Sequence, residues 1–414
     1  MPFEFSFTEE QEKFRRDVRE FIHNEIMPTV ANYDKIEELP LENIEKMSEQ
    51  GYFGLTVPEK FGGKGLSKIE YGILLEELGA ICASHGTILG AHLGLCVTPI
   101  ILFGTEKQKN KFLPTLASGK SIGAFALTEP GAGSDAANLQ TTATADGDDF
   151  VLNGTKIFCT NGDKADYIIV FASNDKSLGP MGGITAFIVE KNMPGFSVGK
   201  KEKKLGLRAS STIELIFENC KVPKENILGD IGAGFMIALS TLDGGRITLA
   251  VGSLGAAQRA LDLSVDYLRQ NQGEGGNLSN RQSIQWKLAD VAMEVYASKF
   301  MCYNNLVELE KYYEVIESKE KVPRQLRDRV SRGSAISKAY VSEVASRAIT
   351  TAIEIQGLTG ITAGSELERG FRDSFIAEIY EGTNDIQRMI IAVSYTHLRA
   401  HETDSYLVCR LLLE

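Results

Sequence analysis

The spacing of apolar residues changes twice along the chain and divides it into three parts. Over residues 1–120 apolar positions recur every three or four residues, as at Phe14, Val18 and Ile22 after a helix cap at Thr8. From 121 to 232 the pattern alternates, and from 233 to 393 the helical period returns. The pattern therefore predicts a helical domain, a β domain and an antiparallel helical bundle.

Six alternating or β-branched runs in the middle part indicate strands. The dipeptides Asp146-Gly147 and Asn153-Gly154 stand between some of them, as hairpin turns require. Because no helical pattern of any length intervenes, we predict an antiparallel β domain. The runs cover 121–128, 138–145, 149–152, 165–172, 183–189 and 211–217.

One uncharged stretch, residues 81–104, is long enough to span a bilayer. It also contains two histidines, three glycines before Pro99, and no flanking Lys or Arg anchors. We therefore expect a buried core helix and no membrane span. Gly86, Gly90 and Gly94 fall on one face of this helix, where the missing side chains admit either a flat ligand or a second helix.

Composition narrows the classes of function. The chain has 414 residues, with 44 Lys plus Arg against 55 Asp plus Glu, a net charge of −11. This charge argues against nucleic-acid binding, which needs a positive surface. The six cysteines are widely spaced without a C-x-x-C, which indicates reduced thiols, and the acidic start lacks the features of a targeting peptide. We expect a cytoplasmic protein.

Several common catalytic motifs are absent from the sequence. Residues 131–136 fit G-x-G-x-x-A, but Pro130 precedes them and no helical pattern follows, so they do not predict nicotinamide binding. The histidines are scattered and form no H-E-x-x-H, so no metal site is expected. There is also no P-loop and no G-x-S-x-G elbow.

Three segments hold the remaining candidate chemistry. FALTEPGAGSD (125–135) offers backbone N–H groups and hydroxyls to a polar ring or a phosphate, or is an ordinary turn. GTKIFCTNG (154–162) sets Phe158 and Thr160 on one strand face, either as the wall of a flat site or as core packing. In AEIYEGTNDIQR (377–388), Glu381 follows an apolar stretch at a helix break and is either a base with a raised pKa or a solvated carboxylate.

Together these segments closely resemble the acyl-CoA dehydrogenase family, from Phe7 to Ala392. Residues 91–113 are most similar to its short-chain, butyryl-type members. The resemblance implies N-terminal helices, an antiparallel β-barrel and a C-terminal four-helix bundle, with FAD between the last two. Further matching stretches are KKLGLRASS (203–211), VPKENILGDIGAGF (222–235) and TLDGGR (241–246).

The resemblance also implies roles for individual residues. Glu381 falls on the base that removes the α-proton of an acyl-CoA, while its own N–H and a flavin hydroxyl bind the thioester carbonyl. Ser134, Asp243, Arg246 and Gly382 fall on substrate contacts. The positions that fall on FAD contacts are Phe125, Leu127, Thr128, Ser134, Phe158, Cys159, Thr160, Thr383 and Asp385.

The implied reaction passes the β-hydride to flavin N5 and yields a trans-2-enoyl-CoA. The implied electron acceptor is an electron-transferring flavoprotein, and the expected assembly is a homo-oligomer, a dimer or a tetramer. Two alternatives stay open: an enoyl-CoA reductase running in reverse, and a non-catalytic or heteromeric homologue that binds FAD weakly.

Four stretches depart from the family pattern. Residues 271–275 replace a run whose Arg and aromatic reach the FAD of a neighbouring subunit, and 354–358 replace a Q-x-x-G-G turn there. The charge of Glu354 repels a pyrophosphate unless it is compensated. Residues 311–332 form either a solvated helix hairpin or a replacement for the lost phosphate contacts. The tail, 394–414, has no counterpart in the family and is excluded from functional inference.

Overall fold

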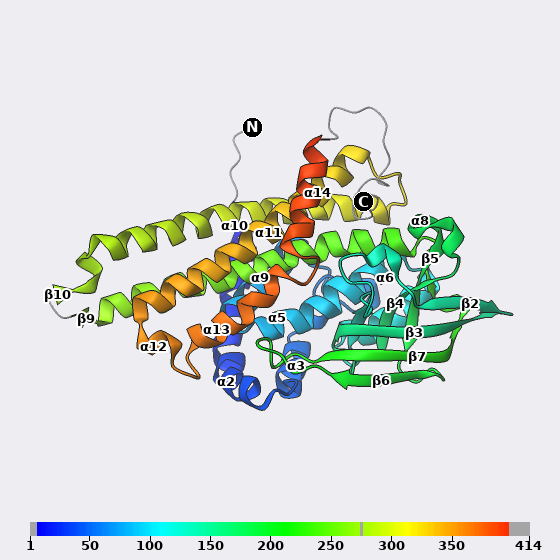
Figure 1. The fold of residues 1–414 in the computed structure, drawn as a ribbon, viewed down its shortest axis with the longest axis horizontal. Helices are drawn as coiled ribbons and strands as arrows, with labels where there is room; N and C mark the ends of the chain where they lie inside the picture. Colours follow the sequence, from blue (N-terminus) through cyan, green and yellow to red (C-terminus); the bar gives the residue numbers. More distant parts are fainter. Residues whose placement is uncertain (1–5, 274–275, 397–414) are drawn as a thin grey trace.

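The computed structural model describes residues 6–273 and 276–396 and has three parts in the order helices, sheet, helices (Figure 1). This order confirms the predicted fold class. Helices of the N-terminal part pack against both of the others, since α4 lies along the long helix α9 and the π-helix η4 lies against strand β1. The candidate site is built where these three parts meet.

The N-terminal helices begin where the sequence places caps. Thr8 Oγ1 accepts a hydrogen bond from Gln11 N at 3.2 Å, and Ser67 caps α4 in a similar capping box. The helices are α1 (Glu9–Phe21), η1 (Ile22–Ile26), α2 (Met27–Ile36), α3 (Leu41–Glu49), η2 (Tyr52–Gly54), η3 (Glu59–Phe61), α4 (Lys68–Ile81), α5 (Ala83–Leu89), η4 (Gly90–Val97), α6 (Thr98–Phe103) and α7 (Glu106–Ala117).

The uncharged stretch is a core segment, as expected. Ala83–Phe103 is long and apolar enough to cross a membrane, but 72% of its most apolar window is buried inside the fold. Its π-helix positions the site strand: Gly123 N donates to His92 Nδ1 at 3.0 Å, and a side chain at Gly123 would meet Cys96 Cβ at 2.6 Å. The five described cysteines are free and buried.

The middle part is one eight-stranded sheet, but it is neither closed nor wholly antiparallel. The strand path runs β6-β7-β3-β2-β4-β5-β8, and within the described residues β8 does not pair with β6 to form a barrel. Strand β1 pairs with β4 in parallel, because a connection long enough for a crossover separates them. The strands are β1 (Gly123–Ala126), β2 (Thr142–Asp146), β3 (Asp149–Thr160), β4 (Tyr167–Ser173), β5 (Ile184–Glu190), β6 (Phe196–Lys201), β7 (Thr212–Pro223) and β8 (Ile227–Leu228), with short helices η5 (Ala136–Asn138), η6 (Lys176–Leu178), α8 (Pro180–Gly183) and η7 (Lys224–Asn226) between them.

Only one of the two predicted turns is a turn. Gly147, with φ at +63°, closes the β2–β3 hairpin, in which Asp146 pairs with Asp149. Asn153-Gly154 lies inside β3, where the pairing with β7 shifts register between Leu152 and Gly154. A side chain on Gly154 would meet Thr141 Oγ1 at 2.5 Å, so this glycine serves a bulge and a close approach.

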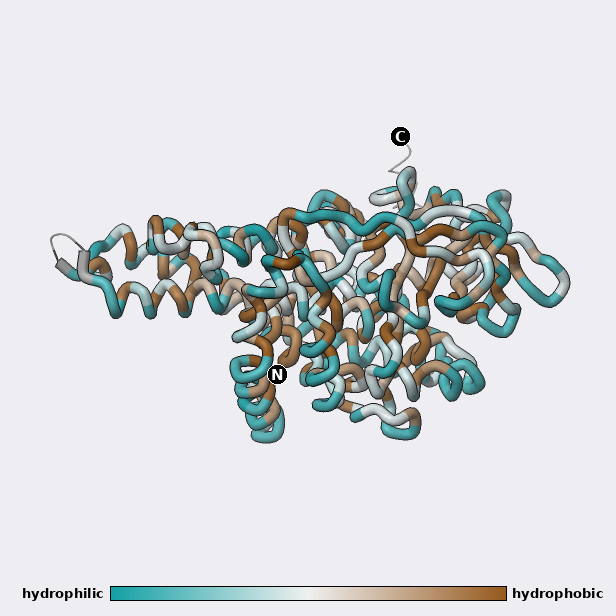
Figure 2. The backbone as a smooth tube through the Cα atoms, turned by 90° about the horizontal axis from the view of Figure 1, so that it is seen from below, coloured by the Kyte–Doolittle hydropathy of each residue, from teal (hydrophilic) through white to brown (hydrophobic). Residues whose placement is uncertain are grey.

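The C-terminal part is a bundle of long helices that extends beyond the rest of the molecule. Figure 2 shows the tip of the α9–α10 hairpin projecting from the body. Residues 311–332 span the end of α10, the connection 318–323 and the start of α11. Arg324 pairs with Asp328 within α11, and Arg329 pairs with Glu308 of α10. The elements are α9 (Gly234–Gln270), β9 (Gln272–Gly273), β10 (Gly276–Asn277), η8 (Leu278–Asn280), α10 (Gln282–Glu317), α11 (Arg324–Gln356), α12 (Leu358–Ile361), α13 (Glu366–Ser374), η9 (Phe375–Glu378) and α14 (Asn384–Thr396).

The first residues of the tail belong to helix α14. Helix α14 continues through Ser394 to Thr396, and Ser394 Oγ donates to Ile391 O at 2.7 Å. The rest of the tail, 397–414, lies outside the described residues, and so do Glu274 and Gly275 of the departing run 271–275.

Candidate active site

A cavity of about 150 Å³ lies between α4, α5, α9 and α13 and reaches the end of β3. Most of the residues that line the cavity are small or apolar. A side chain built on Gly90 would meet nothing within 4 Å, and one on Gly86 would only touch Leu78 Cβ at 4.0 Å. These two glycines therefore open space for a ligand instead of admitting a second helix. The wall includes Gly79, Gly86, Thr87, Gly90, Leu95, Thr160, Gly245, Leu249, Gly252, Tyr380 and Glu381.

Glu381 reaches this cavity from a sharp turn between η9 and α14. Glu381 and Gly382 both have left-handed backbones, with φ at +59° and +87°. Such a conformation is uncommon for a glutamate and marks a position that the surrounding structure holds in place. Gly245 of α9 makes room for the carboxylate, since a Cβ there would lie 2.8 Å from Glu381 Oε2.

Two side chains hold the carbonyl groups of this turn. Arg246 Nε donates to Glu381 O at 3.2 Å, while Gln387 Nε2 donates to Glu381 O at 3.3 Å and to Gly382 O at 2.9 Å. Arg246 is in turn paired with Asp243 at 2.8 Å. The structure thus brings Asp243, Arg246 and Gly382, all predicted site residues, to the turn that bears Glu381.

The electrostatics of Glu381 suit a proton acceptor. The residue as a whole is partly exposed, but its Oε2 is buried and has no hydrogen-bond partner among the described residues. Burial raises the pKa of Glu381 to about 7, against the opposing positive charges of Arg246 and then Lys338. A carboxylate with this pKa ionises near neutral pH, so it exchanges a proton readily there.

Strand β3 places its three predicted residues differently from one another. A register shift against β7 between Lys156 and Cys159 breaks the alternation, and Phe158 has a φ of +57°. Phe158 is consequently 60% exposed, Thr160 lines the cavity, and Cys159 is buried with its Sγ 3.4 Å from Phe125 O. Only Thr160 of these three shares the cavity with Glu381.

The loop that follows β1, residues 127–135, does not line the cavity, and hydrogen bonds from strand β3 hold it in place. Thr128 O accepts from Ile157 N at 2.9 Å, and Leu127 O accepts from Lys156 Nζ at 3.0 Å. Lys156 also pairs with Glu129 at 2.7 Å, and neither side chain is more than slightly exposed. Sequence reasoning missed this pair, although a lysine within a buried strand was a usable signal.

The remaining predicted residues lie at the edges of the site. Phe125 packs against Phe171 with ring centroids 5.0 Å apart, and Ser134 is exposed. Thr383 Oγ1 accepts from Ile386 N at 3.3 Å at the start of α14, and Asp385 is exposed beside Arg388. None of these four residues lines the cavity that holds Glu381.

Comparison with known proteins assigns all three parts of the chain. Residues 8–120, 124–220 and 232–396 match the N-terminal, middle and C-terminal domains of acyl-CoA dehydrogenase. The chain is 41% identical over 389 residues to the short-chain specific acyl-CoA dehydrogenase of Clostridium acetobutylicum, which covers 94% of this chain and 98% of that protein. The chain belongs to the acyl-CoA dehydrogenase family.

One further relative and two solved structures are also similar over most of this chain. The acryloyl-CoA reductase (NADH) of Anaerotignum propionicum is 40% identical over 391 residues, 94% of this chain and 95% of that protein. A chain from the structure described as "Electron transferring flavoprotein of Acidaminococcus fermentans: Towards a mechanism of flavin-based electron bifurcation" is 41% identical with a TM-score of 0.88, covering 96% and 100%. An acyl-CoA dehydrogenase of Bacillus anthracis complexed with FAD is 36% identical with a TM-score of 0.87, covering 95% and 68%.

FAD is the cofactor of this flavin-dependent acyl-CoA dehydrogenase, and the residues present fit it. Side chains built on Gly131 or Gly133 would meet nothing within 4 Å, so the loop leaves room for a ligand against its backbone. The exposed ring of Phe158 offers an apolar face to a flat heterocycle, and the hydroxyls of Ser134 and Thr160 offer hydrogen bonds.

The two runs that depart from the family pattern make local contacts of their own. The carboxylate of Glu354 forms an ion pair with Lys287 of α10, so the negative charge at this position has a counter-charge beside it. In the other departing run, Asn271 Nδ2 donates to Tyr267 O at 2.9 Å and so ends α9.

Proposed function

We propose that this enzyme catalyses the α,β-dehydrogenation of a short-chain acyl-CoA thioester to a trans-2-enoyl-CoA, with Glu381 as the α-proton base. The observation that supports it most is the buried, unpartnered Oε2 of Glu381 in a cavity, on a carboxylate whose pKa burial raises to about 7. Similarity to a short-chain specific dehydrogenase supports the substrate class.

In this mechanism the chain binds, polarises and deprotonates the thioester. The Glu381 carboxylate takes the α-proton, and the electron pair of that C–H bond becomes the new C=C bond as a hydride leaves the β-carbon. The chemistry that bound FAD supplies is acceptance of this hydride at N5. Within the described part of the chain the N–H of Glu381 donates to no protein acceptor, so it is free to hydrogen-bond the thioester carbonyl and stabilise the charge that develops there.

We further propose how the chain holds its ligands. The backbone of 125–128 with the hydroxyl of Thr128 would face the flavin ring. Phe158, Cys159 and Thr160 would form the opposite wall, with the Phe158 ring and the Thr160 hydroxyl toward the ligand and Cys159 buried behind them. Ser134, Thr383 and Asp385 would contact the rest of FAD or the CoA arm. Asp243 and Arg246 would act on the substrate side through the Glu381 turn, to which Arg246 is hydrogen-bonded.

The reverse reaction is a second candidate, because a relative at 40% identity is an acryloyl-CoA reductase. The same residues would serve both directions, with protonated Glu381 returning the proton to the α-carbon. Comparing rates with butyryl-CoA plus an oxidised mediator against crotonyl-CoA plus a reduced one decides between them. A non-catalytic homologue is disfavoured, since a buried and unpartnered carboxylate costs stability that a scaffold has no use for.

We propose an electron-transferring flavoprotein as the acceptor, supported by the similarity to a chain from such a structure. We also propose a homo-oligomer, a dimer or a tetramer, since Trp286, Met293 and Tyr296 on α10 are 64%, 63% and 67% exposed. Free, buried thiols support a reducing, cytoplasmic setting. Light scattering on the eluting protein measures the assembly.

Glu381→Gln tests the proposal, with Glu378→Gln as the matched control. Glu378 lies three residues earlier, accepts from Ser346 Oγ and does not line the cavity. Anaerobic bleaching of the flavin band by butyryl-CoA should slow at least about 100-fold in E381Q at unchanged flavin content, and stay close to wild type in E378Q. Near-normal bleaching in E381Q refutes the assignment of the base.

A further inference from the structure

A second buried cation lies close to the Glu381 turn. Lys338 of α11 is fully buried, and its Nζ donates to Asn384 Oδ1 at 2.8 Å. In the described part of the chain no carboxylate oxygen lies within 4.0 Å of this ammonium group. Burying a lysine without an adjacent counter-ion is costly, so the position calls for a physical reason.

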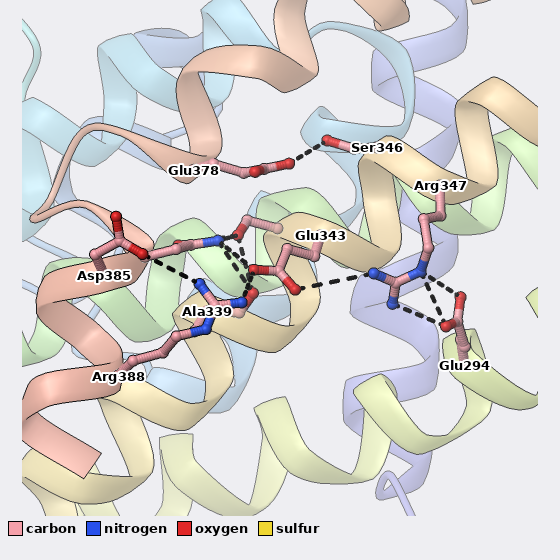
Figure 3. A network of polar contacts seen from close by, with 10 residues as sticks. Glu294, Ala339, Glu343, Ser346, Arg347, Glu378, Asp385 and Arg388 are labelled. Atoms are coloured by element: carbon pink, nitrogen blue, oxygen red, sulfur yellow. Dashed lines mark hydrogen bonds and ion pairs between the residues drawn. The ribbon is translucent and has the colours of Figure 1, made fainter. Parts of the chain in front are cut away.

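Asn384 connects Lys338 to the turn. It is the first residue of α14, three residues after Glu381, and its Nδ2 lies 3.3 Å from Ala339 O, 3.0 Å from Ser342 Oγ and 3.1 Å from Glu343 Oε1. Figure 3 shows Glu343 of this network between Arg388 and Arg347. The C-terminal side of the turn is thereby fixed to α11, while Arg246 fixes its carbonyl from α9.

The charges around Lys338 point to Glu381 as its electrostatic partner. Burial lowers the pKa of Lys338 to about 8, and Glu381 is the largest influence in the opposite direction, ahead of Glu378 and Glu343, while Arg246 acts with burial. Lys338 is therefore still protonated near pH 7, where Glu381 titrates. Around Glu381 the other titratable groups are Arg246, the buried Tyr71 and Tyr313, and the partly buried Tyr380. The three tyrosines stay neutral at that pH because their pKa values are raised.

We propose that Lys338 is a positioning residue for the base: its hydrogen bond to Asn384 fixes the turn that bears Glu381, and its buried charge favours the ionised carboxylate. This inference rests on the proposed role of Glu381. It assigns a task to a residue outside the cavity wall, on a helix that contributes no reacting group. The expected consequence is that the pH at which Glu381 ionises depends on the charge at position 338.

Three variants of the holoenzyme separate charge from hydrogen bonding. Lys338→Met removes both, Lys338→Gln removes the charge but keeps a donor, and Ser342→Ala removes a hydrogen bond to Asn384 without changing any charge. Difference infrared spectra against E381Q follow the carboxylate band of Glu381 directly as pH is varied. Flavin reduction by butyryl-CoA gives an independent pH profile.

If the charge of Lys338 favours the ionised carboxylate, the infrared midpoint of Glu381 rises by about one pH unit in K338M and K338Q and stays at the wild-type value in S342A. Flavin reduction at a pH below the midpoint should then be about tenfold slower in the two lysine variants. An unchanged midpoint in either of them, or an equal rise in S342A, overturns the proposal. Because the infrared band needs no turnover, it answers this question even if E381Q proves active and the proposed function fails.

Discussion

Replacing Gly245 by alanine should reduce catalysis without reducing stability. A Cβ at this position would lie 2.8 Å from Oε2 and 2.9 Å from Oε1 of Glu381, whereas ordinary van der Waals contact begins at 3.4 Å. The three nearest atoms all belong to the end of one flexible side chain, so the carboxylate can move and the fold is spared. Alanine in the middle of α9 also gains about 1 kcal/mol of helix propensity over glycine.

The size of the catalytic effect follows from this displacement. Glu381 must retreat by roughly 0.6 Å, and a misplacement of about 1 Å of a reacting group costs on the order of 100-fold in rate. We therefore expect G245A to reduce flavin by butyryl-CoA about ten- to 100-fold more slowly than wild type. Its melting temperature should equal or exceed that of wild type, because alanine has a higher helix propensity than glycine in α9.

Gly252→Ala on the same helix is the matched control. Gly252 also lines the cavity, but a Cβ there would meet only Leu75 O, at 3.9 Å. The variant therefore adds a methyl group to the same wall and the same helix and leaves Glu381 untouched. Stopped-flow measurement of anaerobic flavin reduction, together with scanning calorimetry, separates the two effects. A wild-type rate in G245A, or a melting temperature several degrees below that of G252A, would contradict the proposed packing of Gly245 against the base.

Four further outcomes are expected. Because burial raises the pKa of Glu381 to about 7, flavin reduction should accelerate as pH rises through 7. Stability should change in the opposite direction. The pKa of Glu381 is higher in the folded protein than the 4.5 of the unfolded chain, so the free energy of unfolding falls as pH rises between these two pKa values. A denaturation series that shows the same slope in E381Q would contradict this. Gly90→Leu should fill open space in the cavity and lower kcat/KM for octanoyl-CoA about tenfold more than for butyryl-CoA; an unchanged ratio would mean that Gly90 does not face the acyl chain. Lys156→Met leaves Glu129 buried without its partner and should cost about 3–5 kcal/mol in urea denaturation, whereas Lys107→Met, which breaks the exposed pair with Glu225, should cost at most about 1 kcal/mol.

Local signals in the sequence predicted the elements well where a single residue type determines geometry. Thr8 caps α1 and Gly147 closes the β2–β3 hairpin, because capping and left-handed turns depend on the residues themselves. Strand β6, by contrast, was not predicted. It is a largely exposed edge strand whose pattern is set by pairing with β7 alone, so no apolar face marks it in the sequence.

The same difference between local signals and tertiary contacts applies to the candidate site. Resemblance to a family selected Glu381, Thr160, Asp243 and Arg246, and the structure gathers these residues around one cavity and one turn. The exposure of Phe158 was not predictable, because it follows from a register shift against β7, a partner more than fifty residues away in sequence. Lys338 was missed for the same reason, since its burial beside the Glu381 turn is recognised only once its surroundings are known. The Lys156–Glu129 pair differs, because a lysine within a buried strand already signals a buried partner.

By itself the sequence determined the order of helices, sheet and helices, and its resemblance to a family singled out Glu381 as the candidate base. Only the tertiary structure decided that this carboxylate is buried, unpartnered and shifted in pKa. Those properties belong to no single segment. Gly245 of α9 leaves room for the carboxylate, and Gln387 of α14 holds its turn. The positive charges of Arg246 on α9 and Lys338 on α11 limit the rise in pKa that burial causes. Burial and charge act through space, and their strength depends on distances that only the folded chain fixes.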